Sequence, residues 1–274
     1  MKLTLTGAGG KMGLRIARNL MNSNYQMSYL EINSRGREAL MKLNLSTSRE
    51  EEVIPDSDIV ILAVPDNMQK EISRQIVPKM KPGSMLFTLD PACALAGKLV
   101  HRDDLNYVIA HPCHPSVFNW EPSAEAQKDF FGGESAKQSV VCALFHGKES
   151  AYAIGEQLAR NMYAPVKKVF RITADQMGLL EPALVETLCS TLQVVVREGL
   201  EKVIEKGVPP EAAKEFLLGH INIQLAVLYD QIPGAVFSDA ANKAIERGKP
   251  LLVQKDWEKV FDEDNVREQI NDII

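Results

Sequence analysis

A glycine-rich turn directly after the first apolar segment constrains the fold of this chain more than any other feature. Residues 1–6 alternate as a short strand does, glycine then occupies positions 7, 9, 10 and 13, and residues 14–21 continue at helical period. This order is typical of a βαβ unit that binds a dinucleotide, because glycine lets the backbone approach a pyrophosphate at the helix N-terminus. The spacing is a variant of the usual G-x-G-x-x-G, and a turn that binds no ligand is the alternative.

The end of the next predicted strand, residues 25–31, supplies the second half of such a site. Glu31 closes this strand, and a carboxylate there accepts hydrogen bonds from ribose hydroxyls and repels a 2′-phosphate, which predicts NAD rather than NADP. Arg35 and Arg37 follow closely and could accommodate that phosphate, while Glu31 could also be an ordinary strand-end residue. The predicted cofactor-binding residues are Gly7, Ala8, Gly9, Gly10, Lys11, Met12, Gly13, Glu31, Val64, Pro65 and Asp66. Asp66 is about equally suited to cap the helix that follows it.

Strands and helices alternate up to residue 172, and helices alone follow. The near-continuous apolar segment 58–64 predicts a strand buried on both faces of a parallel sheet. Further strands are predicted at 84–89, 107–110, 139–145 and 166–172. We therefore predict an α/β protein, with a Rossmann-type doubly wound parallel sheet in residues 1–172 and an all-helical C-terminal domain for substrate binding and dimerisation in residues 173–274. The cleft between the two domains is the expected ligand site.

The composition is that of an ordinary globular enzyme. Hydrophobic residues make up 45% of the chain and charged residues 24%, and the net charge of −5 offers no basic surface for nucleic acid. No apolar run approaches the roughly 20 residues of a membrane span, so we expect no membrane partner. The four cysteines show no C-x-x-C spacing and are expected to be reduced and buried. Together with a first strand at the N-terminus, they predict a cytoplasmic protein without a signal peptide.

Two histidines, three positions apart and each followed by proline, stand directly after a predicted strand. Histidine transfers protons near neutral pH and binds metal ions, and proline stiffens the loop that presents the two rings. His111 and His114 are therefore candidate site residues, although a pair of surface histidines in a rigid turn is the alternative. His101, His146 and Cys113 carry no functional prediction, because packing or exposure explains each at least as well.

Two carboxylates lie in a strongly apolar segment at the start of the helical half. Glu186 begins a polar stripe that continues at i+4, i+7 and i+11, and a buried carboxylate needs a partner because burying it unpaired is costly. Glu181 is about 140° away from Glu186 around an ideal α-helix, so both reach one site only if Pro182 marks a bend or a turn. Otherwise one or both are solvated or capping residues.

Four segments in this order bring one family into view. The segments G-A-G-G-K-M-G at 7–13, D-I-V-I-L-A-V-P-D at 58–66, H-P-C-H-P at 111–115 and E-P-A-L-V-E-T at 181–187 resemble the bacterial D-apionate oxidoisomerases. These are small NAD-dependent relatives of the 6-phosphogluconate and 3-hydroxyacid dehydrogenases. The likeness covers nearly the whole chain, and the last two segments are the specific ones. The resemblance implies oxidation of a branched sugar acid with NAD, coupled to a 1,2-shift that yields a 3-oxo acid.

The implied chemistry looks like that of ketol-acid reductoisomerase run toward oxidation. The broader hydroxyacid dehydrogenases use a lysine on the first interdomain helix, whereas residues 173–192 contain no lysine. We therefore expect His111 to act as the general base, with Glu186 as the second candidate. A divalent metal ion would hold the substrate oxygens during a shift, and His114 and Glu181 are its expected ligands. The histidine loop and the two glutamates are expected to face the nicotinamide from opposite sides of the cleft.

Two other functions would need the same glycine turn. A simple hydroxyacid or prephenate-type dehydrogenase would catalyse no rearrangement, and a non-catalytic NAD-binding sensor would have little use for paired histidines beside carboxylates. Quaternary structure is also predicted: the helical segment 184–204 is too apolar for a lone surface helix, so we expect a homodimer in which a second subunit covers it.

Overall fold

The computed structural model describes residues 1–274, and the chain divides into two compact units. Unit 1 comprises Met1–Leu180 together with Arg267–Ile274, and unit 2 comprises Glu181–Val266. The division falls after Leu180, later than the domain boundary expected after residue 172, because the short helix that follows the last strand packs against the sheet of unit 1.

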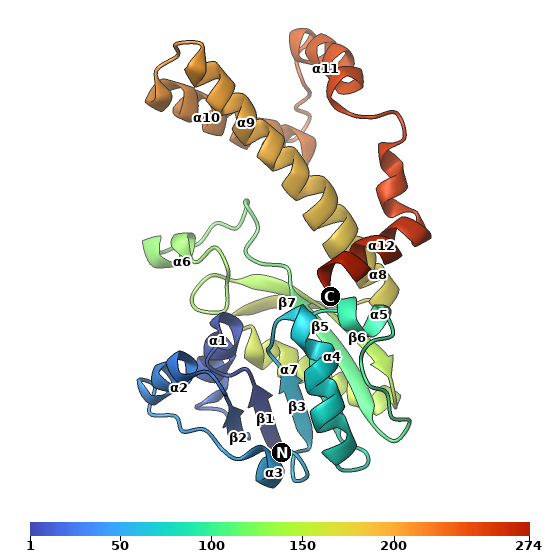
Figure 1. Cartoon of the computed structure of the whole chain (residues 1–274). Helices are drawn as coiled ribbons and strands as arrows, with labels where there is room; N and C mark the ends of the chain where they lie inside the picture. The colour runs from blue at the N-terminus through green and yellow to red at the C-terminus, as the bar shows by residue number, and fades with distance from the viewer. The chain divides into compact units, whose positions relative to one another are not determined.

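Unit 1 is built on one sheet of seven strands, and every strand expected from the sequence is present (Figure 1). Their order in the sheet is β2-β1-β3-β4-β5-β6-β7. The strands are β1 (Lys2–Thr6), β2 (Gln26–Leu30), β3 (Ile59–Leu62), β4 (Met85–Thr88), β5 (Asn106–Pro112), β6 (Gln138–His146) and β7 (Val166–Arg171). All residues of β3 are buried, as its continuous apolar sequence predicts.

The sheet is parallel except at one junction. β5 and β6 are antiparallel, with Ala110 opposite Cys142, and β7 is parallel to β6. The expectation of a wholly parallel sheet is therefore corrected at β6 and β7, which run against the other strands. The connection from β5 to β6 contains only the short helix α6 (Ala124–Lys128), whereas a parallel crossover usually carries a helix that packs across the sheet face.

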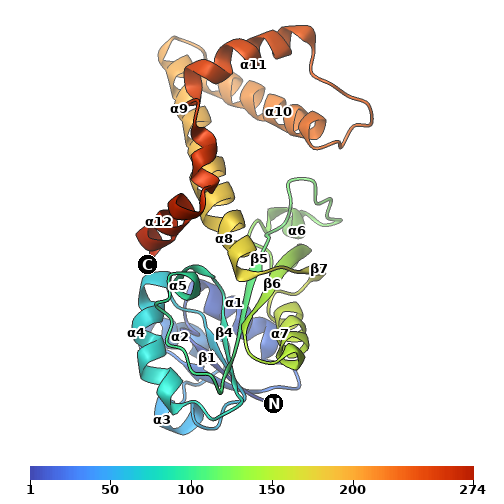
Figure 2. The same cartoon turned by 90° about the vertical axis from the view of Figure 1, so that its right-hand side faces the viewer.

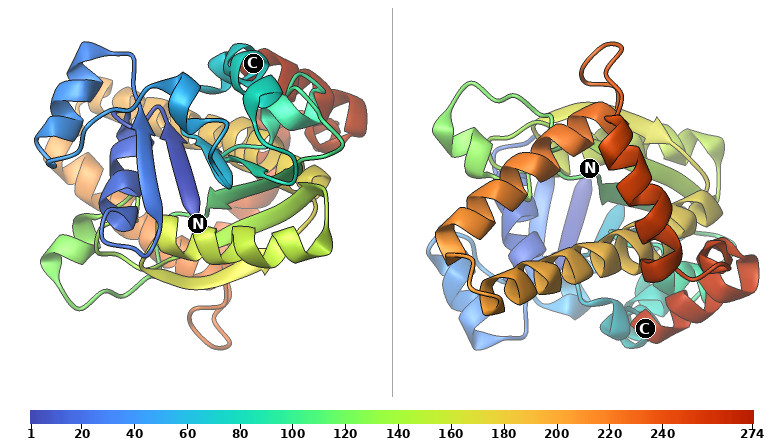
Figure 3. Two further views of the ribbon diagram at one scale, coloured as in Figure 1. Left: turned by 90° about the horizontal axis from the view of Figure 1, so that it is seen from below. Right: turned by 90° about the horizontal axis from the view of Figure 1, so that it is seen from above.

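Helices cover both faces of the sheet in unit 1 (Figure 3, left). Ile16 and Leu158, from α1 and α7, join one buried cluster with Leu5 and Phe87 of the strands, and Ile76 of α4 belongs to the cluster on the opposite face. The helices are α1 (Lys11–Leu20), α2 (Ser34–Met41), α3 (Glu50–Val53), α4 (Asp66–Ile76), η1 (Val77–Lys79), α5 (Ala92–Leu95), α6, α7 (Glu149–Met162) and α8 (Ala174–Gly178).

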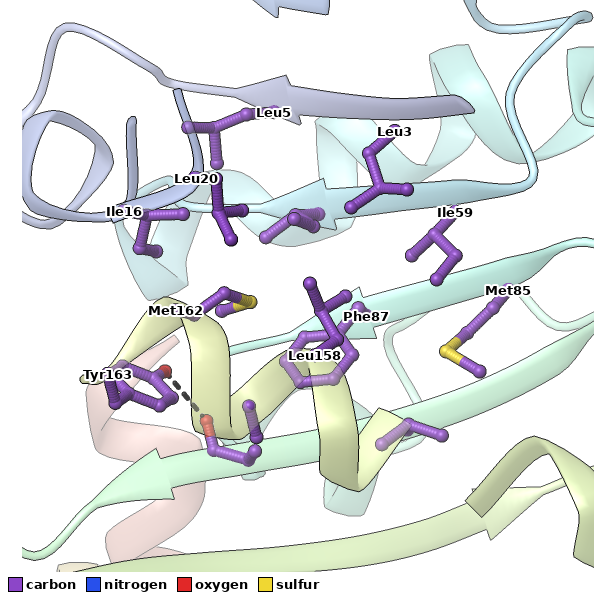
Figure 4. Packing of buried hydrophobic residues seen from close by; sticks show 14 of the residues in the cluster. Leu3, Leu5, Ile16, Leu20, Ile59, Met85, Phe87, Leu158, Met162 and Tyr163 are labelled. Atoms are coloured by element: carbon purple, nitrogen blue, oxygen red, sulfur yellow. Dashed lines mark hydrogen bonds between the residues drawn. The ribbon is translucent and has the colours of Figure 1, made fainter. Parts of the chain in front are cut away.

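The larger cluster of buried side chains includes one hydrogen-bonded tyrosine. Leu3, Ile59 and Met162 are nearly inaccessible to solvent, and Figure 4 shows their side chains interleaved between the strands and the two helices. Tyr163 is equally buried, and its hydroxyl donates to the carbonyl oxygen of Ala110 at 2.9 Å. This bond satisfies the only polar atom of a side chain that is otherwise packed in the core.

Unit 2 consists of helices, as the sequence predicts for this part of the chain. It contains most of η2 (Leu179–Ser190), followed by α9 (Thr191–Glu205), α10 (Pro210–Leu228), α11 (Asp239–Leu252) and η3 (Trp257–Phe261), and α12 (Glu263–Ile273) ends the chain. Helices α9 and α10 meet near the loop that joins them (Figure 2) and line a mostly apolar pocket of about 730 Å³. No residue of α9 is buried.

One helix is long and apolar enough to cross a membrane, judged by length and composition alone. It runs over Ala174–Glu205 with a mean hydropathy of 1.4 in its most apolar window. No apolar run of that length was expected from the sequence, because polar residues such as Glu181 and Glu186 interrupt this segment. Its mean hydropathy is high despite these residues. A single helix of this kind is a weak indication of a membrane span, and a subunit interface also needs an exposed apolar surface.

The cysteines divide into two pairs. Cys93 and Cys142 are buried, and burial raises the pKa of the Cys142 thiol to about 12 and that of Cys93 to about 11. Cys113 and Cys189 are exposed, which corrects the expectation that all four are buried. Cys113 lies just beyond the end of β5, and Cys189 lies on η2, where apolar neighbours in sequence do not produce burial.

Candidate active site

A pocket of about 520 Å³ lies at the carboxyl ends of β1, β2 and β3 in unit 1. Ligands of doubly wound sheets bind at this edge. The pocket is lined by six of the predicted cofactor-binding residues, which are Gly7, Gly9, Gly10, Glu31, Val64 and Pro65. Ile32 and Arg35 also line it. Ile32 is 88% exposed, and apart from its position after Glu31 nothing in the sequence marks it as a site residue.

The glycine turn is as tight as its spacing predicts. Gly7 has φ +67°, and a Cβ atom on it would lie 2.3 Å from the carbonyl oxygen of Ala63. A Cβ atom on Gly13 would lie 2.1 Å from the carbonyl oxygen of Gly7. No other residue fits at either position without a backbone shift, because real Cβ contacts are not this short. Ala8 is fully buried beneath the turn, where its N–H donates to Leu30.

A further close glycine contact links the turn to the helix after β2. A Cβ atom on Gly9 would lie 2.3 Å from the Cα of Gly36 in α2, and one on Gly36 would lie 2.7 Å from the Glu31 carboxyl carbon. Glu31 accepts hydrogen bonds from the N–H of Gly9 and of Asn33, both at 2.8 Å. The carboxylate therefore stands between the turn and α2, and Gly36 is a site residue that the sequence analysis missed.

The start of α1 has no side-chain cap, so its first amides remain for a bound phosphate. Lys11, the first residue of the helix, holds its Nζ 3.4 Å from the centroid of the Phe131 ring. Arg15 donates to the carbonyl oxygen of Gly132 at 2.8 Å. These two contacts hold the segment 129–133 against the beginning of α1. Met12 packs on the core and, like Ala8, Lys11 and Gly13, does not line the pocket.

Asp66 lies at the start of α4 but does not line the pocket. Pro65, not Asp66, occupies the N-cap position, so the alternative that Asp66 caps this helix is not met. The Asp66 carboxylate instead accepts from the Nε2 of Gln69 at 2.7 Å. Val64 and Pro65 carry the chain past the glycine turn, where Val64 stands 2.9 Å from a Cβ atom built on Gly7.

His111 belongs to the last residues of β5, whereas the sequence analysis placed it in the loop beyond that strand. Its Nδ1 lies 2.9 Å from the carbonyl oxygen of Leu89. Because a carbonyl oxygen only accepts, Nδ1 carries the proton, and the lone pair of the neutral ring is on Nε2. Burial lowers the pKa of His111 below its usual value, against smaller raising effects of Leu89 and Asp90. The imidazole is therefore neutral near pH 7.

The carboxylate of Asp90 stands close to this histidine. Its ligand oxygen and a ring nitrogen of His111 lie within 4.8 Å of each other. The same carboxylate accepts from the N–H of Ala92 at 2.7 Å and so also starts α5. The sequence does not reveal this proximity, since Asp90 follows β4 whereas His111 belongs to β5.

His114 follows in a strained backbone conformation, with φ +59°. Its Nδ1 lies 2.9 Å from the carbonyl oxygen of Phe131, which again leaves the lone pair on Nε2. The His111 and His114 rings are edge to face, with centroids 6.3 Å apart. Two imidazoles held by backbone carbonyls through Nδ1 are arranged as metal ligands usually are.

Glu181 and Glu186 lie on η2, which is wound as a π-helix with Pro182 inside it. Its i→i+5 hydrogen bonding brings residues five apart to about one turn apart. This winding reduces the separation of the two carboxylates around the helix axis relative to an α-helix, although Glu181 is half-buried and Glu186 is exposed. Ser190 Oγ donates to the carbonyl oxygen of Val185, five residues earlier. The polar stripe predicted at α-helical spacing is consequently interrupted between Glu186 and Ser190, its first two residues.

The residues of unit 1 fit both groups that the sequence predicts. The glycine cradle, the uncapped helix and the Glu31 carboxylate suit a dinucleotide. Imidazole Nε2 lone pairs beside the Asp90 carboxylate suit a borderline divalent ion such as Zn²⁺ or Ni²⁺. Calcium prefers a shell of oxygen ligands, to which this part of the chain contributes mainly Asp90.

Family models match both halves of the chain. The NAD binding domain of 6-phosphogluconate dehydrogenase matches residues 2–90, and phosphogluconate dehydrogenase (decarboxylating) C-term matches residues 119–274. Fold and site thus define an NAD-binding oxidoreductase with a Rossmann domain and a helical C-terminal domain.

Individual relatives narrow this class. A D-apionate oxidoisomerase of Cupriavidus necator is 50% identical over 99% of both chains, and one of Rhizobium rhizogenes is 46% identical over 99% of this chain and 98% of the relative. A crystal structure of a semialdehyde dehydrogenase NAD-binding protein from Cupriavidus necator, in complex with calcium and NAD, is 50% identical with a TM-score of 0.97, covering 100% of this chain and 99% of that one. The chain belongs to the D-apionate oxidoisomerase family, and the resemblance found in its sequence is confirmed.

Proposed function

We propose that this protein oxidises D-apionate, a branched sugar acid, with NAD and couples the oxidation to a 1,2-shift that yields a 3-oxo acid. The identity of 50% and 46% to D-apionate oxidoisomerases over nearly full length supports this substrate. The oxidation takes a hydride from a carbinol carbon and a proton from its hydroxyl. The shift moves one carbon substituent to the neighbouring carbon and is redox-neutral, so one NAD is reduced per turnover.

The observation that carries the proposal is the pair of histidines at the end of β5, with His111 inside the strand and His114 just beyond it. When bound, NAD accepts the hydride. His111 takes the hydroxyl proton at Nε2, since its Nδ1 proton is committed to Leu89 and its lowered pKa keeps the ring neutral. Glu186 is the alternative base. The absence of lysine in residues 173–192 argues against the proton transfer of ordinary 3-hydroxyacid dehydrogenases.

We further propose that a divalent metal ion binds near the histidines, where it would polarise the substrate oxygens. His114 and Glu181 remain the proposed ligands. His114 supports this assignment through the bond of its Nδ1 to Phe131, which orients Nε2. Asp90 is a further candidate ligand, because its carboxylate lies next to His111. A relative that was crystallised in complex with calcium and NAD supports the proposal of a divalent ion.

We place the enzyme in the cytoplasm and propose that it forms a homodimer through unit 2, with no nucleic-acid or membrane partner. Helix α9 exposes Val194, Val195 and Val203 at 56%, 43% and 44%, a surface too apolar to remain in water. A second copy that covers this face would bury it.

The proposed function is tested by incubating the enzyme with D-apionate and NAD, with and without a chelator, and by identifying the product by NMR. We expect NADH and a rearranged 3-oxo acid in equal amounts. An unrearranged keto acid would identify a simple hydroxyacid or prephenate-type dehydrogenase instead. Tight NAD binding without turnover of any sugar acid would favour a non-catalytic sensor. Undiminished turnover after removal of bound metal would exclude a role for the metal ion in the reaction.

A further inference from the structure

A second cluster of metal-binding side chains lies at the edge of the sheet opposite His111. His146 is the last residue of β6 and stands opposite Tyr107, near the beginning of β5. Tyr107 and His111 are four residues apart on β5, about 13 Å along a strand. His101 lies in the connection that leads into β5. The ligand atoms of His101, Asp103 and His146 all lie within 4.8 Å of one another.

The spacing within this cluster is close to that of ligands on one ion. His101 Nε2 and Asp103 Oδ1 are 3.0 Å apart. Two ligands bound to one ion at about 2.0–2.1 Å are about 2.9–3.4 Å apart at angles between 90° and 109°. The His101 and His146 rings are edge to face with centroids 4.4 Å apart. An ion between His101 and Asp103 would take the place of the proton that now links them.

The backbone that carries His101 is fixed by buried contacts. The Tyr107 hydroxyl, in a side chain only 2% exposed, donates to Val100 at 3.0 Å and accepts from the N–H of Arg102 at 2.8 Å. The Tyr107 ring also stacks on His101 with centroids 5.2 Å apart. The residues on both sides of His101 are therefore held in place, and only its side chain has to adjust.

The cation beside His101 in the chain, Arg102, is held by contacts outside the cluster. The guanidinium of Arg102 donates to the carbonyl oxygens of Val77 and Met80, each at 2.8 Å, and pairs with Asp104 at 2.5 Å. Its charge is thereby compensated within its own contacts. Asp103 is 95% exposed and forms its recorded ion pair with His101 alone, so a bound cation would gain a carboxylate without displacing an arginine.

We propose that His101, Asp103 and His146 bind one borderline divalent transition-metal ion, with water completing its shell. Two imidazoles and one carboxylate are ligands that Zn²⁺, Ni²⁺ and Cu²⁺ accept, whereas Ca²⁺ and Mg²⁺ prefer oxygen. The ion would tie the connection before β5 to the end of β6. Because this edge lies away from the cofactor pocket, the site is independent of the proposed oxidation.

Zinc titration of the full-length protein by calorimetry, in metal-free buffer, tests this site. The variants are His101→Gln/His146→Gln, Asp103→Asn, and the control His220→Gln, which removes an exposed imidazole from α10. We expect the wild type and the control to bind one zinc ion more than the double variant, and Asp103→Asn to bind it at least tenfold more weakly. Saturating zinc should raise the unfolding temperature of the wild type by roughly 2–5 °C more than that of the double variant.

Equal zinc stoichiometry in the wild type and the double variant would overturn the proposal. If the double variant does not fold, judged by its unfolding temperature in EDTA, the same comparison with His146→Gln alone decides. Turnover with NAD should stay within twofold of wild type in the folded variants. Because zinc stoichiometry is measured without substrate, failure of this site and failure of the proposed oxidation are distinguished.

Discussion

Unit 1 and unit 2 differ in how far each buries its own apolar side chains. In unit 1 the strands and their helices bury a continuous core, and the glycine turn is packed so closely that a single methyl group would collide with backbone. In unit 2, α9 has no buried residue, and Gly199 in that helix has no atom within 4 Å of a built Cβ. Unit 1 thus buries its apolar side chains within one chain, while unit 2 leaves an apolar surface exposed.

The largest expected effect concerns the chemistry assigned to unit 1. His111→Ala should lower turnover of D-apionate by roughly 10²–10⁴-fold, because a lost general base costs about that much. Affinity for NAD should barely change, since the phosphates bind at the glycine turn. Steady-state kinetics and NAD titration measure the two quantities. Glu186→Gln is the companion variant, and near wild-type turnover in both would show that these residues are structural.

Packing at the glycine turn provides the sharpest contrast between the two units. Gly13→Ala should weaken NAD binding at least tenfold and destabilise the protein by about 1–3 kcal/mol, because the new methyl group would stand 2.1 Å from the Gly7 oxygen. Gly199→Ala is the matched control and should stabilise α9 by about 0.5–1 kcal/mol. Thermal unfolding and calorimetry measure both. If Gly199→Ala destabilised the protein at high concentration only, a partner subunit would lie against Gly199.

A charged side chain on the exposed face of α9 tests whether this face forms the proposed dimer interface. Val195→Asp should weaken self-association at least tenfold, since a carboxylate in an apolar interface loses its hydration without gaining a partner. Light scattering across a range of concentrations measures this effect. Ile154→Asp introduces the same charge at an apolar residue of α7 that is 40% exposed in unit 1, and it should leave association unchanged. A wild type that is monomeric at micromolar concentration would contradict the homodimer.

A smaller effect is expected on the preference for NAD over NADP when Glu31 is replaced. Glu31→Ala should narrow the preference for NAD over NADP by roughly tenfold, because it removes one charge-assisted interaction with the ribose and the repulsion of a 2′-phosphate. It also removes the acceptor of the Gly9 and Asn33 amides, so Glu31→Gln is a useful control that keeps an oxygen there. The ratio of kcat/KM for the two cofactors is the measurement. Equal use of both cofactors by the wild type would refute the role of Glu31.

The smallest effect is a dependence of stability on pH. Burial lowers the pKa of folded His111, so below the unfolded value of about 6.5 the unfolded chain binds a proton that the folded protein refuses. Stability should therefore fall as pH falls through about 6.5, by at most about 1.4 kcal/mol per pH unit from this group. Denaturant unfolding in EDTA between pH 7.5 and about 5 measures it. His111→Gln should lose less stability over this range, and identical curves would contradict the assignment.

The sequence by itself determined the features that depend on neighbours along the chain. Alternation and apolar runs located all seven strands, and the glycine spacing located a turn whose geometry the structure reproduces at Gly7 and Gly13. These signals are local, because a strand, a turn and the first turn of a helix are each specified within a few residues. The resemblance to D-apionate oxidoisomerases rests on the same short segments.

Only the tertiary structure decided which distant residues meet. The reversal of β6, the approach of Gly36 to Gly9 and the position of Asp90 beside His111 all depend on pairing between separate elements. Periodicity along the chain carries no record of such pairing. The π-helical winding of η2 is a different case, since it changes the number of residues per turn and so the separation of Glu181 and Glu186 around the helix axis. The angle of about 140° expected for an α-helix therefore does not apply here, because the residues alone do not reveal which helical period they adopt.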